Sequence, residues 1–193
     1  MTIKSRIMDS TELSRTILRL SYEILERNKG TQGLAIIGIR SRGVPIARCI
    51  VKNIASVENC PLEMGILDIT LYRDDLTTIS DQPVVKPTQI PFDITGKKIV
   101  LIDDVLYTGR TIRCAIDQIM DFGRPASIQL AVIIDRGHRE LPIQADYVGK
   151  LVATNKNEVI EVRVEEIDGY DEVLVMVGTG SKPAHLPDKE SRQ

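Results

Sequence analysis

The chain has 193 residues, of which 42% are hydrophobic and 27% are charged, and its formal net charge is −2. This length suits one α/β domain with a small appendage and is sufficient to bury a core. The net charge excludes a generally basic nucleic-acid binder, so any RNA contact would need a local basic face. No apolar run approaches the roughly 18 residues that a membrane span needs, and no signal-peptide segment opens the chain, so we expect a cytoplasmic protein.

Cysteine and histidine are too few and too scattered for a zinc site or a disulfide framework. Cys49, Cys60 and Cys114 form no CxxC pair, and the two histidines are His138 and His185. Such cysteines are typical of reduced cytosolic thiols.

The first half of the chain predicts helices and strands in alternation. Asp9 followed by Glu12 resembles a capping box and predicts a helix start. The helix that follows has apolar residues at helical spacing, namely Leu13, Ile17, Leu20 and Ile24. A continuous apolar run predicts a buried strand over 34–39, and Pro45 suits the first turn of the next helix. Residues 62–71 predict a further strand.

A long polar connection follows at about 72–91. It contains Pro83, Pro87 and Pro91 and shows no helical spacing. Because connections of this length inside a compact domain are usually functional or mobile, we expect a flexible loop here.

The second half continues the alternation. Branched apolar residues at 99–102 predict a buried strand, and an amphipathic helix follows and stops at Gly123. Further strands are predicted at 128–134, 147–152, 159–164 and 173–177, with a tail at about 178–193. This order predicts an α/β fold with a right-handed, doubly wound, mostly parallel sheet, in a single domain that spans residues 1–193.

The segment from Ile99 to Thr111 has the order expected for a sugar-phosphate site. The buried strand ends in Asp103 and Asp104, a short turn gives Thr-Gly-Arg-Thr, and a helix begins directly. Ligands bind at the carboxyl ends of strands in open parallel sheets, and a glycine turn that opens a helix offers backbone N–H groups to phosphate. We therefore expect hydroxyl or metal contacts at the acid pair and a phosphate at the turn.

Two other predicted strands end in polar residues that should lie beside this segment. They are followed by Arg40–Gly43 and by Asp135–Arg139. Parallel strands place such ends along one edge of the sheet. Arg40 and Arg42 can present guanidinium groups to a diphosphate.

Two common nucleotide-binding motifs are absent. Gly38 and Gly43 have the glycine spacing of a P-loop, but Val44 stands where the lysine is required, and no G-x-G-x-x-G occurs. These observations exclude a P-loop ATPase or kinase and a dinucleotide-dependent dehydrogenase.

The central segment resembles the phosphoribosyl-pyrophosphate (PRPP) motif of type I phosphoribosyltransferases. Over residues 10–177 the chain resembles more specifically the PyrR family of pyrimidine operon attenuators that are also uracil phosphoribosyltransferases. The segments that carry this likeness are Glu26–Gly30, Leu67–Asp75, Val105–Thr111, Gly123–Pro125 and Asp135–Pro142.

The resemblance implies a type I phosphoribosyltransferase fold with a small hood, and the reaction of uracil with PRPP to give UMP and pyrophosphate. The implied catalytic residues are Asp103 and Asp104, which bond the ribose 2′- and 3′-hydroxyls, and Arg42, which with Mg²⁺ stabilises the departing pyrophosphate. The implied PRPP and UMP contacts are Ser41, Arg42, Gly43, Asp103, Asp104, Val105, Leu106, Tyr107, Thr108, Gly109, Arg110 and Thr111. Mg²⁺ should enter with PRPP rather than occupy a preformed cage, although the acid pair could bind it directly.

The remaining implied residues lie in two loops. Arg136 and His138 are assigned to uracil and UMP, and Arg73 and Lys86 in the flexible loop are candidate diphosphate contacts. A homo-oligomer, dimeric or larger, is also implied. Two alternatives stay open: a purine phosphoribosyltransferase, against which the Asp135–Pro142 loop argues, and a non-catalytic RNA-binding attenuator that senses UMP or PRPP.

The resemblance is uneven at the RNA face of the attenuators, which bind pyrimidine-operon leader RNA. The residues at matching positions are Arg19, Arg27, His138 and Lys150. The pattern prefers Thr, His and Arg at the positions of Leu18, Tyr22 and Gln144. One lost base contact can cost roughly 1–3 kcal/mol. RNA binding is therefore left open, and Tyr22 could still stack on a base.

Overall fold

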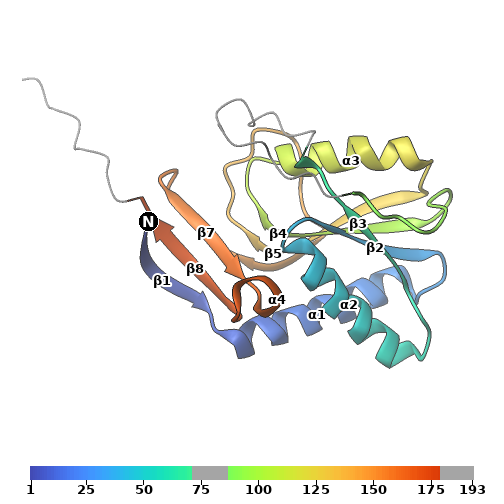
Figure 1. Cartoon of the computed structure of the whole chain (residues 1–193), viewed down its shortest axis with the longest axis horizontal. Helices are drawn as coiled ribbons and strands as arrows, with labels where there is room; N and C mark the ends of the chain where they lie inside the picture. The colour runs from blue at the N-terminus through green and yellow to red at the C-terminus, as the bar shows by residue number, and fades with distance from the viewer. Residues whose placement is uncertain (71–86, 179–193) are drawn as a thin grey trace, which may run out of the picture.

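The computed structural model describes residues 1–70 and 87–178. Its core is a five-stranded parallel sheet with helices on both faces, and a small antiparallel sheet stands beside it (Figure 1). The parallel sheet has the order β3 (Glu63–Leu67), β2 (Leu34–Ile39), β4 (Lys98–Leu106), β5 (Ser127–Asp135) and β6 (Tyr147–Leu151). The small sheet has the order β1 (Thr2–Met8), β8 (Glu172–Val177) and β7 (Glu158–Arg163). We call this second sheet, with the short helix α4 (Glu165–Asp168) that joins β7 to β8, the hood.

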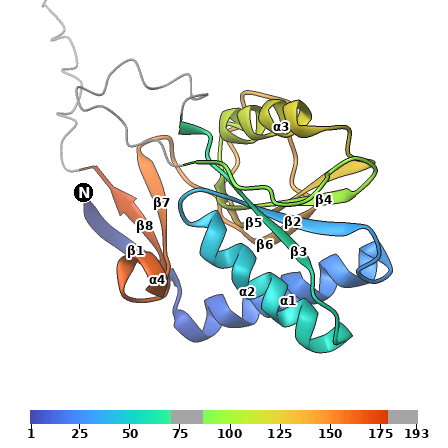
Figure 2. The same ribbon diagram turned by 45° about the vertical axis from the view of Figure 1, so that its right-hand side comes forward.

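Helices α1 (Ser10–Asn28) and α2 (Gly43–Glu58) cover one face of the parallel sheet, and α3 (Arg110–Phe122) covers the other (Figures 1 and 2). Successive residues of β4 alternate between two buried clusters. Val100 packs in the cluster on the α1 and α2 side, and Leu101 packs in the cluster on the α3 side. Strands covered on both faces need continuous apolar residues, which explains the runs in the sequence.

The first helix begins where the sequence predicts. Asp9 accepts a hydrogen bond from the Glu12 backbone N–H, the Glu12 carboxylate accepts one from the Asp9 N–H, and Lys29 closes the helix in the left-handed conformation. The capping box is therefore confirmed. No helix within residues 1–70 and 87–178 is long and apolar enough to cross a membrane.

Two elements differ from the predictions. The strand predicted at 62–71 is shorter, because β3 ends at Leu67. The strand β1 was not predicted, since most of its side chains are exposed and leave no hydrophobic pattern. It is held by antiparallel backbone pairing with β8, with Arg6 opposite Leu174. Of the flexible loop predicted at about 72–91, residues 72–86 lie outside the described residues, and Gln89 forms an isolated bridge with Ile66.

Two glycines allow α2 to start close against the sheet. A Cβ atom on Gly43 would lie 2.4 Å from the carbonyl oxygen of Ile102, and one on Gly38 would lie 2.8 Å from that of Gly43. Any larger residue would push α2 away from β4. The close packing places the Arg40–Arg42 loop beside the end of β4, where the acid pair lies.

Candidate functional site

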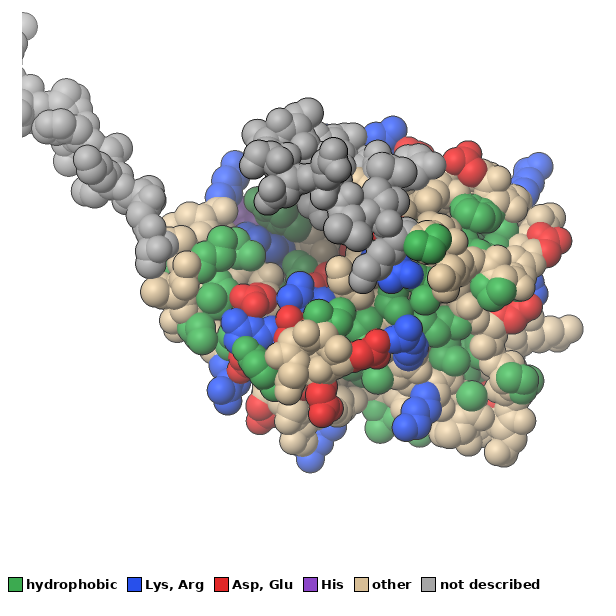
Figure 3. Space-filling model, viewed as in Figure 1, with side chains coloured by type: hydrophobic (Ala, Val, Ile, Leu, Met, Phe, Trp, Pro, Cys, Tyr) green, Lys and Arg blue, Asp and Glu red, His purple; other side chains and the backbone are tan. Residues whose placement is uncertain are grey.

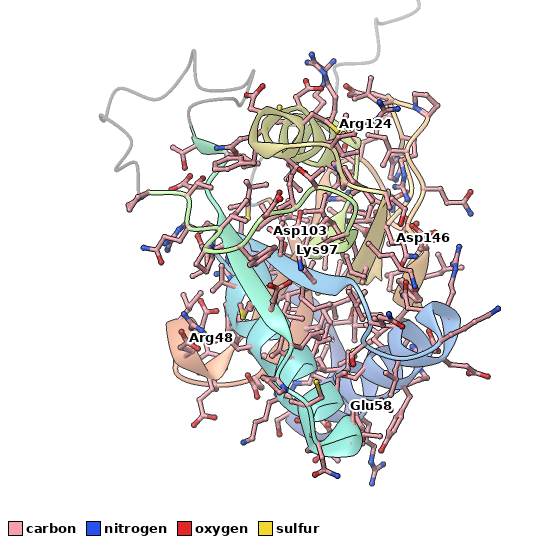
Figure 4. All side chains as sticks on the ribbon, turned by 90° about the vertical axis from the view of Figure 1, so that its right-hand side faces the viewer. Arg48, Glu58, Lys97, Asp103, Arg124 and Asp146 are labelled. Atoms are coloured by element: carbon pink, nitrogen blue, oxygen red, sulfur yellow. The ribbon has the colours of Figure 1, made fainter. Side chains whose placement is uncertain are left out.

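A polar cavity of about 260 Å³ lies at the carboxyl ends of β2 and β4. It is lined by Arg40, Ser41, Arg42, Ile69, Asp103, Asp104, Val105 and Thr111. We call it the acid cavity. On the molecular surface a hollow separates the hood from the core, with charged side chains at its edge (Figure 3), and Asp103 lies in the middle of the molecule (Figure 4). The cavity thus joins residues from two of the three predicted strand ends, and adds Ile69, which carried no site prediction.

The two carboxylates are fixed at the end of β4. Asp103 is only 6% exposed and accepts a hydrogen bond of 3.0 Å from the Asp104 backbone N–H. Asp104 accepts one of 2.9 Å from the Val105 N–H. Burial raises the pKa of Asp104, while its hydrogen bond with Asp103 and the charge of Arg42 act in the opposite direction. Asp103 is buried and Asp104 is half-buried, and two acids side by side in such a place cost stability unless a ligand with hydroxyl groups or positive charge uses them.

The loop between β2 and α2 contributes two guanidinium groups to the same cavity. The buried Nε of Arg40 has no hydrogen-bond partner within the described part of the chain, which is unusual for a buried donor. Arg42 is held by Asp168 of the hood through two hydrogen bonds, and this contact raises its pKa. The Arg40–Ser41 peptide bond is cis. Arg40 and Arg42 together make this side of the cavity suitable for an anion.

The Thr-Gly-Arg-Thr turn, Thr108–Thr111, opens α3. Gly109 has φ = +93° and takes the N-cap position, where no side chain caps the helix. The first N–H groups of a helix without a capping side chain can bind a phosphate. Thr111 also lines the acid cavity, so a phosphate at the turn and a ribose at the acid pair would be adjacent.

The turn is braced by residues 135–144, which we call the base loop. The backbone N–H groups of Glu140 and Leu141 both donate to the Thr108 carbonyl, at 2.9 and 3.2 Å. Arg139 donates to the Tyr107 carbonyl at 2.8 Å, and Arg110 donates to the Glu140 carboxylate at 2.7 Å. The third predicted strand end therefore supports the turn, as expected for neighbouring parallel strands.

Arg136 and His138 line a second cavity, which shares no lining residue with the acid cavity. The Arg136 side chain is buried, donates to Thr154 Oγ1 at 3.0 Å and lies over the ring of Tyr107. His138 Nε2 lies 2.6 Å from the carbonyl oxygen of Thr154. Both line a wide cavity of about 870 Å³ between the base loop and residues 151–154. The structure thus does not bring them into the acid cavity itself, and Arg73 and Lys86 lie outside the described residues.

The three cations predicted for an RNA face all lie at the α1 and β6 surface. Arg19 donates to the Gly149 carbonyl at 2.6 Å and pairs with Glu23 at 2.5 Å. Arg27 pairs with Asp146 at 2.8 Å. Lys150 donates to the Ile7 carbonyl at 3.4 Å. Tyr22 on the same helix is 50% exposed. The cations do share one face, but acidic residues partly neutralise it.

Comparisons with known proteins identify the family. A model of the phosphoribosyl transferase domain matches residues 5–167. The chain is 57% identical to the bifunctional protein PyrR of Thermus aquaticus over 173 residues, covering 90% of this chain and 96% of that one. It is 55% identical to the PyrR of Clostridioides difficile, covering 91% of this chain and 99% of that one.

Solved structures share the fold at low sequence identity. A hypoxanthine phosphoribosyltransferase of Staphylococcus aureus aligns with a TM-score of 0.66 at 18% identity and covers 89% of this chain and 92% of that one. One of Trypanosoma cruzi aligns with a TM-score of 0.69 at 18% identity and covers 90% of this chain and 91% of that one.

The chain belongs to the PyrR family of phosphoribosyltransferases. This membership confirms the predicted resemblance, the α/β fold and the prediction of a uracil phosphoribosyltransferase of the bifunctional, pyrimidine-regulating kind. The individual site residues, the metal and the RNA partner are taken up below as proposals.

Proposed function

We propose that the acid cavity binds PRPP and transfers its phosphoribosyl group to uracil, giving UMP and pyrophosphate. The observation that carries this assignment is that the acid pair, Arg42 and Thr111 line one cavity. A sugar phosphate activated by a diphosphate needs acceptors for its hydroxyls, a cradle for its 5′-phosphate and cations for its diphosphate. Asp103 and Asp104 supply the hydroxyl acceptors, and the Thr-Gly-Arg-Thr turn supplies the phosphate cradle. Arg42 supplies the cation for the diphosphate.

In the reaction, the bond between ribose C1 and the pyrophosphate oxygen breaks and a bond between C1 and uracil N1 forms. The electron pair of the breaking bond leaves with pyrophosphate, and the proton of uracil N1 is released to the solvent. Asp103 and Asp104 accept hydrogen bonds from the two ribose hydroxyls and so hold C1 in place. The guanidinium of Arg42 stabilises the negative charge that develops on the leaving group. Catalysis is then positioning and electrostatics.

The donor set of the cavity fits Mg²⁺ that arrives with the substrate. The match to the phosphoribosyl transferase domain family supports this ion as the companion of PRPP in the proposal. The acid pair offers carboxylate oxygens, which Mg²⁺ prefers, and in the described ranges no three His, Cys, Asp or Glu residues are grouped as a metal site. When bound with PRPP, the ion would neutralise diphosphate charge. Asp103 and Asp104 are the residues that would hold it if it also contacts the protein.

The base loop is proposed to select uracil. It lines the wide cavity and contacts the Thr-Gly-Arg-Thr turn at the Thr108 carbonyl and the residue before the turn at the Tyr107 carbonyl. Arg136 and His138 are the residues of this loop assigned to the nucleotide. Incubation of the protein with labelled uracil, PRPP and Mg²⁺ tests the proposal, since UMP and pyrophosphate should appear in equal amounts.

We also propose leader RNA of a pyrimidine operon as a partner of the α1 and β6 surface. What favours this is that Arg19, Arg27 and Lys150 lie on one face with the exposed ring of Tyr22. Cations can contact phosphates, and an aromatic ring can stack on an unpaired base. The proposed function also includes a cytoplasmic location and a homo-oligomeric assembly. Analytical ultracentrifugation of the purified protein tests the assembly.

A further inference from the structure

The carboxylate of Asp168 in the hood forms an ion pair with the guanidinium of Arg42. Arg42 Nε donates to Asp168 Oδ2 at 3.1 Å and Arg42 Nη2 donates to Asp168 Oδ1 at 2.9 Å. These two parallel bonds form the bidentate geometry that fixes both the position and the plane of a guanidinium group. The two residues are 126 positions apart in sequence, and Asp168 is the last residue of α4.

Asp168 is itself held in place. Its Oδ2 atom also accepts a hydrogen bond of 2.9 Å from the backbone N–H of Val164, the residue before α4. The adjoining turn is closed by a second carboxylate, because Asp171 Oδ1 accepts the Glu165 N–H at 2.7 Å. The Asp168 side chain is only 17% exposed. The carboxylate therefore presents a fixed surface to Arg42.

The ion pair with Asp168 leaves one nitrogen of Arg42 available to a ligand. Nε and Nη2 are used by Asp168, whereas Nη1 has no hydrogen-bond partner among the described residues. Arg42 lines the acid cavity together with Ser41 and Asp104. Without Asp168, its long side chain would sample several rotamers and would have to be ordered each time an anion binds.

We propose that Asp168 is a positioning residue, which holds the Arg42 guanidinium in the orientation that binds the diphosphate of PRPP and the pyrophosphate product. This inference rests on the proposed function, in which Arg42 contacts the diphosphate. It gives the hood a part in the reaction although it supplies no residue of the acid cavity. The inference also predicts that loss of the Asp168 carboxylate weakens the binding of a diphosphate and leaves the binding of a ligand without a diphosphate unchanged.

The chain offers a matched control for this contact. Arg48 of α2 and Glu166 of α4 form a second ion pair between the same two regions, since Arg42 directly precedes α2 and Asp168 belongs to α4. Both side chains are about half exposed, and neither lines the acid cavity. Arg48 lies at the side of the molecule next to the hood, away from Asp103 (Figure 4). A Glu166→Gln variant therefore removes a contact between hood and core without touching Arg42.

The experiment compares Asp168→Asn, Asp168→Glu, Glu166→Gln and Arg42→Gln in the full-length protein. Calorimetry measures the affinity for inorganic pyrophosphate with Mg²⁺ and, separately, for UMP, and steady-state kinetics give KM for PRPP. We expect Asp168→Asn to weaken pyrophosphate binding and raise KM for PRPP by about tenfold or more, with UMP affinity within about twofold of wild type. Glu166→Gln should leave all three values unchanged, and Asp168→Glu should recover part of the loss.

The opposite results are equally clear. If Asp168→Asn binds pyrophosphate as tightly as wild type, or more tightly, while Arg42→Gln binds it weakly, the positioning role is wrong and the proposed function stands. If Asp168→Asn weakens UMP and pyrophosphate equally, the contact only supports the fold, and the inference is also wrong. If Arg42→Gln leaves pyrophosphate binding unchanged, the proposed role of Arg42 fails and the inference fails with it.

Discussion

The guanidinium of Arg136 lies over the ring of Tyr107, 4.1 Å from the ring centroid. Tyr107 directly precedes the Thr-Gly-Arg-Thr turn, and Arg136 follows β5, so the contact joins the turn to the base loop. Arg136 also donates to the Asn155 carbonyl at 3.1 Å and is only 6% exposed. The buried guanidinium of Arg136 therefore supports the junction between the turn and the base loop, in addition to the nucleotide role proposed for it.

Arg136→Gln should destabilise the protein. The substitution removes a cation–π contact and charge-assisted hydrogen bonds in a buried place, which together predict a loss of about 2–4 kcal/mol in the free energy of unfolding. Urea denaturation followed by circular dichroism measures it. Arg124→Gln, at an exposed arginine just beyond the C-terminal end of α3, is the control. Equal stability of the two variants would mean that the stacked arginine does not support the fold.

Asp104→Asn should impair PRPP use while the fold stays intact. An amide cannot match the charge-assisted hydrogen bonds that a carboxylate accepts from hydroxyl groups, so transition-state stabilisation should fall by about 2 kcal/mol or more. The measurement is kcat/KM for PRPP. A folded variant with the PRPP kinetics of wild type would show that Asp104 is not a ribose contact.

The same substitution should make the protein more stable at neutral pH. Burial raises the pKa of Asp104 in the folded state, so the folded protein binds this proton more tightly than the unfolded chain does. Stability from this group therefore falls as pH rises from the ordinary aspartate pKa of about 3.9 through the raised value. The amide of the variant cannot ionise and escapes this cost. The melting temperature of the variant should be higher than that of the wild type at pH 7. The difference between the two should shrink as pH is lowered towards about 4, near the ordinary pKa. A variant that melts at a lower temperature than the wild type at pH 7 would contradict this explanation.

Gly109→Val should abolish binding of both UMP and PRPP. Gly109 has φ = +93°, and an added Cβ would lie 3.3 Å from the Ile143 Cβ and 3.5 Å from the Leu141 Cβ. A valine is strained in this conformation and would press against the base loop. Calorimetry with UMP measures the effect, and Gly96→Val, at a positive-φ glycine with open space around it, controls for backbone strain alone. UMP binding by Gly109→Val at wild-type affinity would refute the phosphate role of the turn.

The RNA proposal predicts separable activities. Arg19→Gln combined with Arg27→Gln should weaken binding to pyrimidine-operon leader RNA and reduce its dependence on salt, because two phosphate contacts are lost. UMP synthesis should be unchanged, since neither residue lines the two cavities. Filter binding at two salt concentrations, with and without UMP, measures this. RNA binding that is weak, insensitive to UMP and equal in wild type and variant would leave an enzyme without an RNA partner at this face.

Much of the fold could be predicted because its signals are local. The capping box at Asp9, the buried strand at 34–39 and the glycine at the start of α3 each require a particular backbone conformation. The strand β1 could not be predicted, because it is held by backbone pairing to β8 rather than by buried side chains. Propensity and periodicity do not detect such an edge strand.

The site could be predicted only along single segments of the chain. The acid pair and the turn are contiguous, so their order in the sequence indicates their chemistry. The ion pair between Asp168 and Arg42 joins residues 126 positions apart. An aspartate in an acidic stretch before Gly169 does not indicate its partner by its local sequence. The same is true of Ile69, which lines the acid cavity although its sequence suggests only the end of a strand.

The most direct test of the central claim is the rate of nucleotide formation from PRPP and Mg²⁺ with uracil, hypoxanthine or guanine as the acceptor. The proposed function predicts rapid formation of UMP from uracil, little or no product from either purine, and loss of the UMP signal in Asp104→Asn. Product from hypoxanthine or guanine in place of UMP would make the base loop a purine site. Absence of any product, with UMP still bound by the folded protein, would leave a nucleotide-sensing regulator and contradict the enzymatic role.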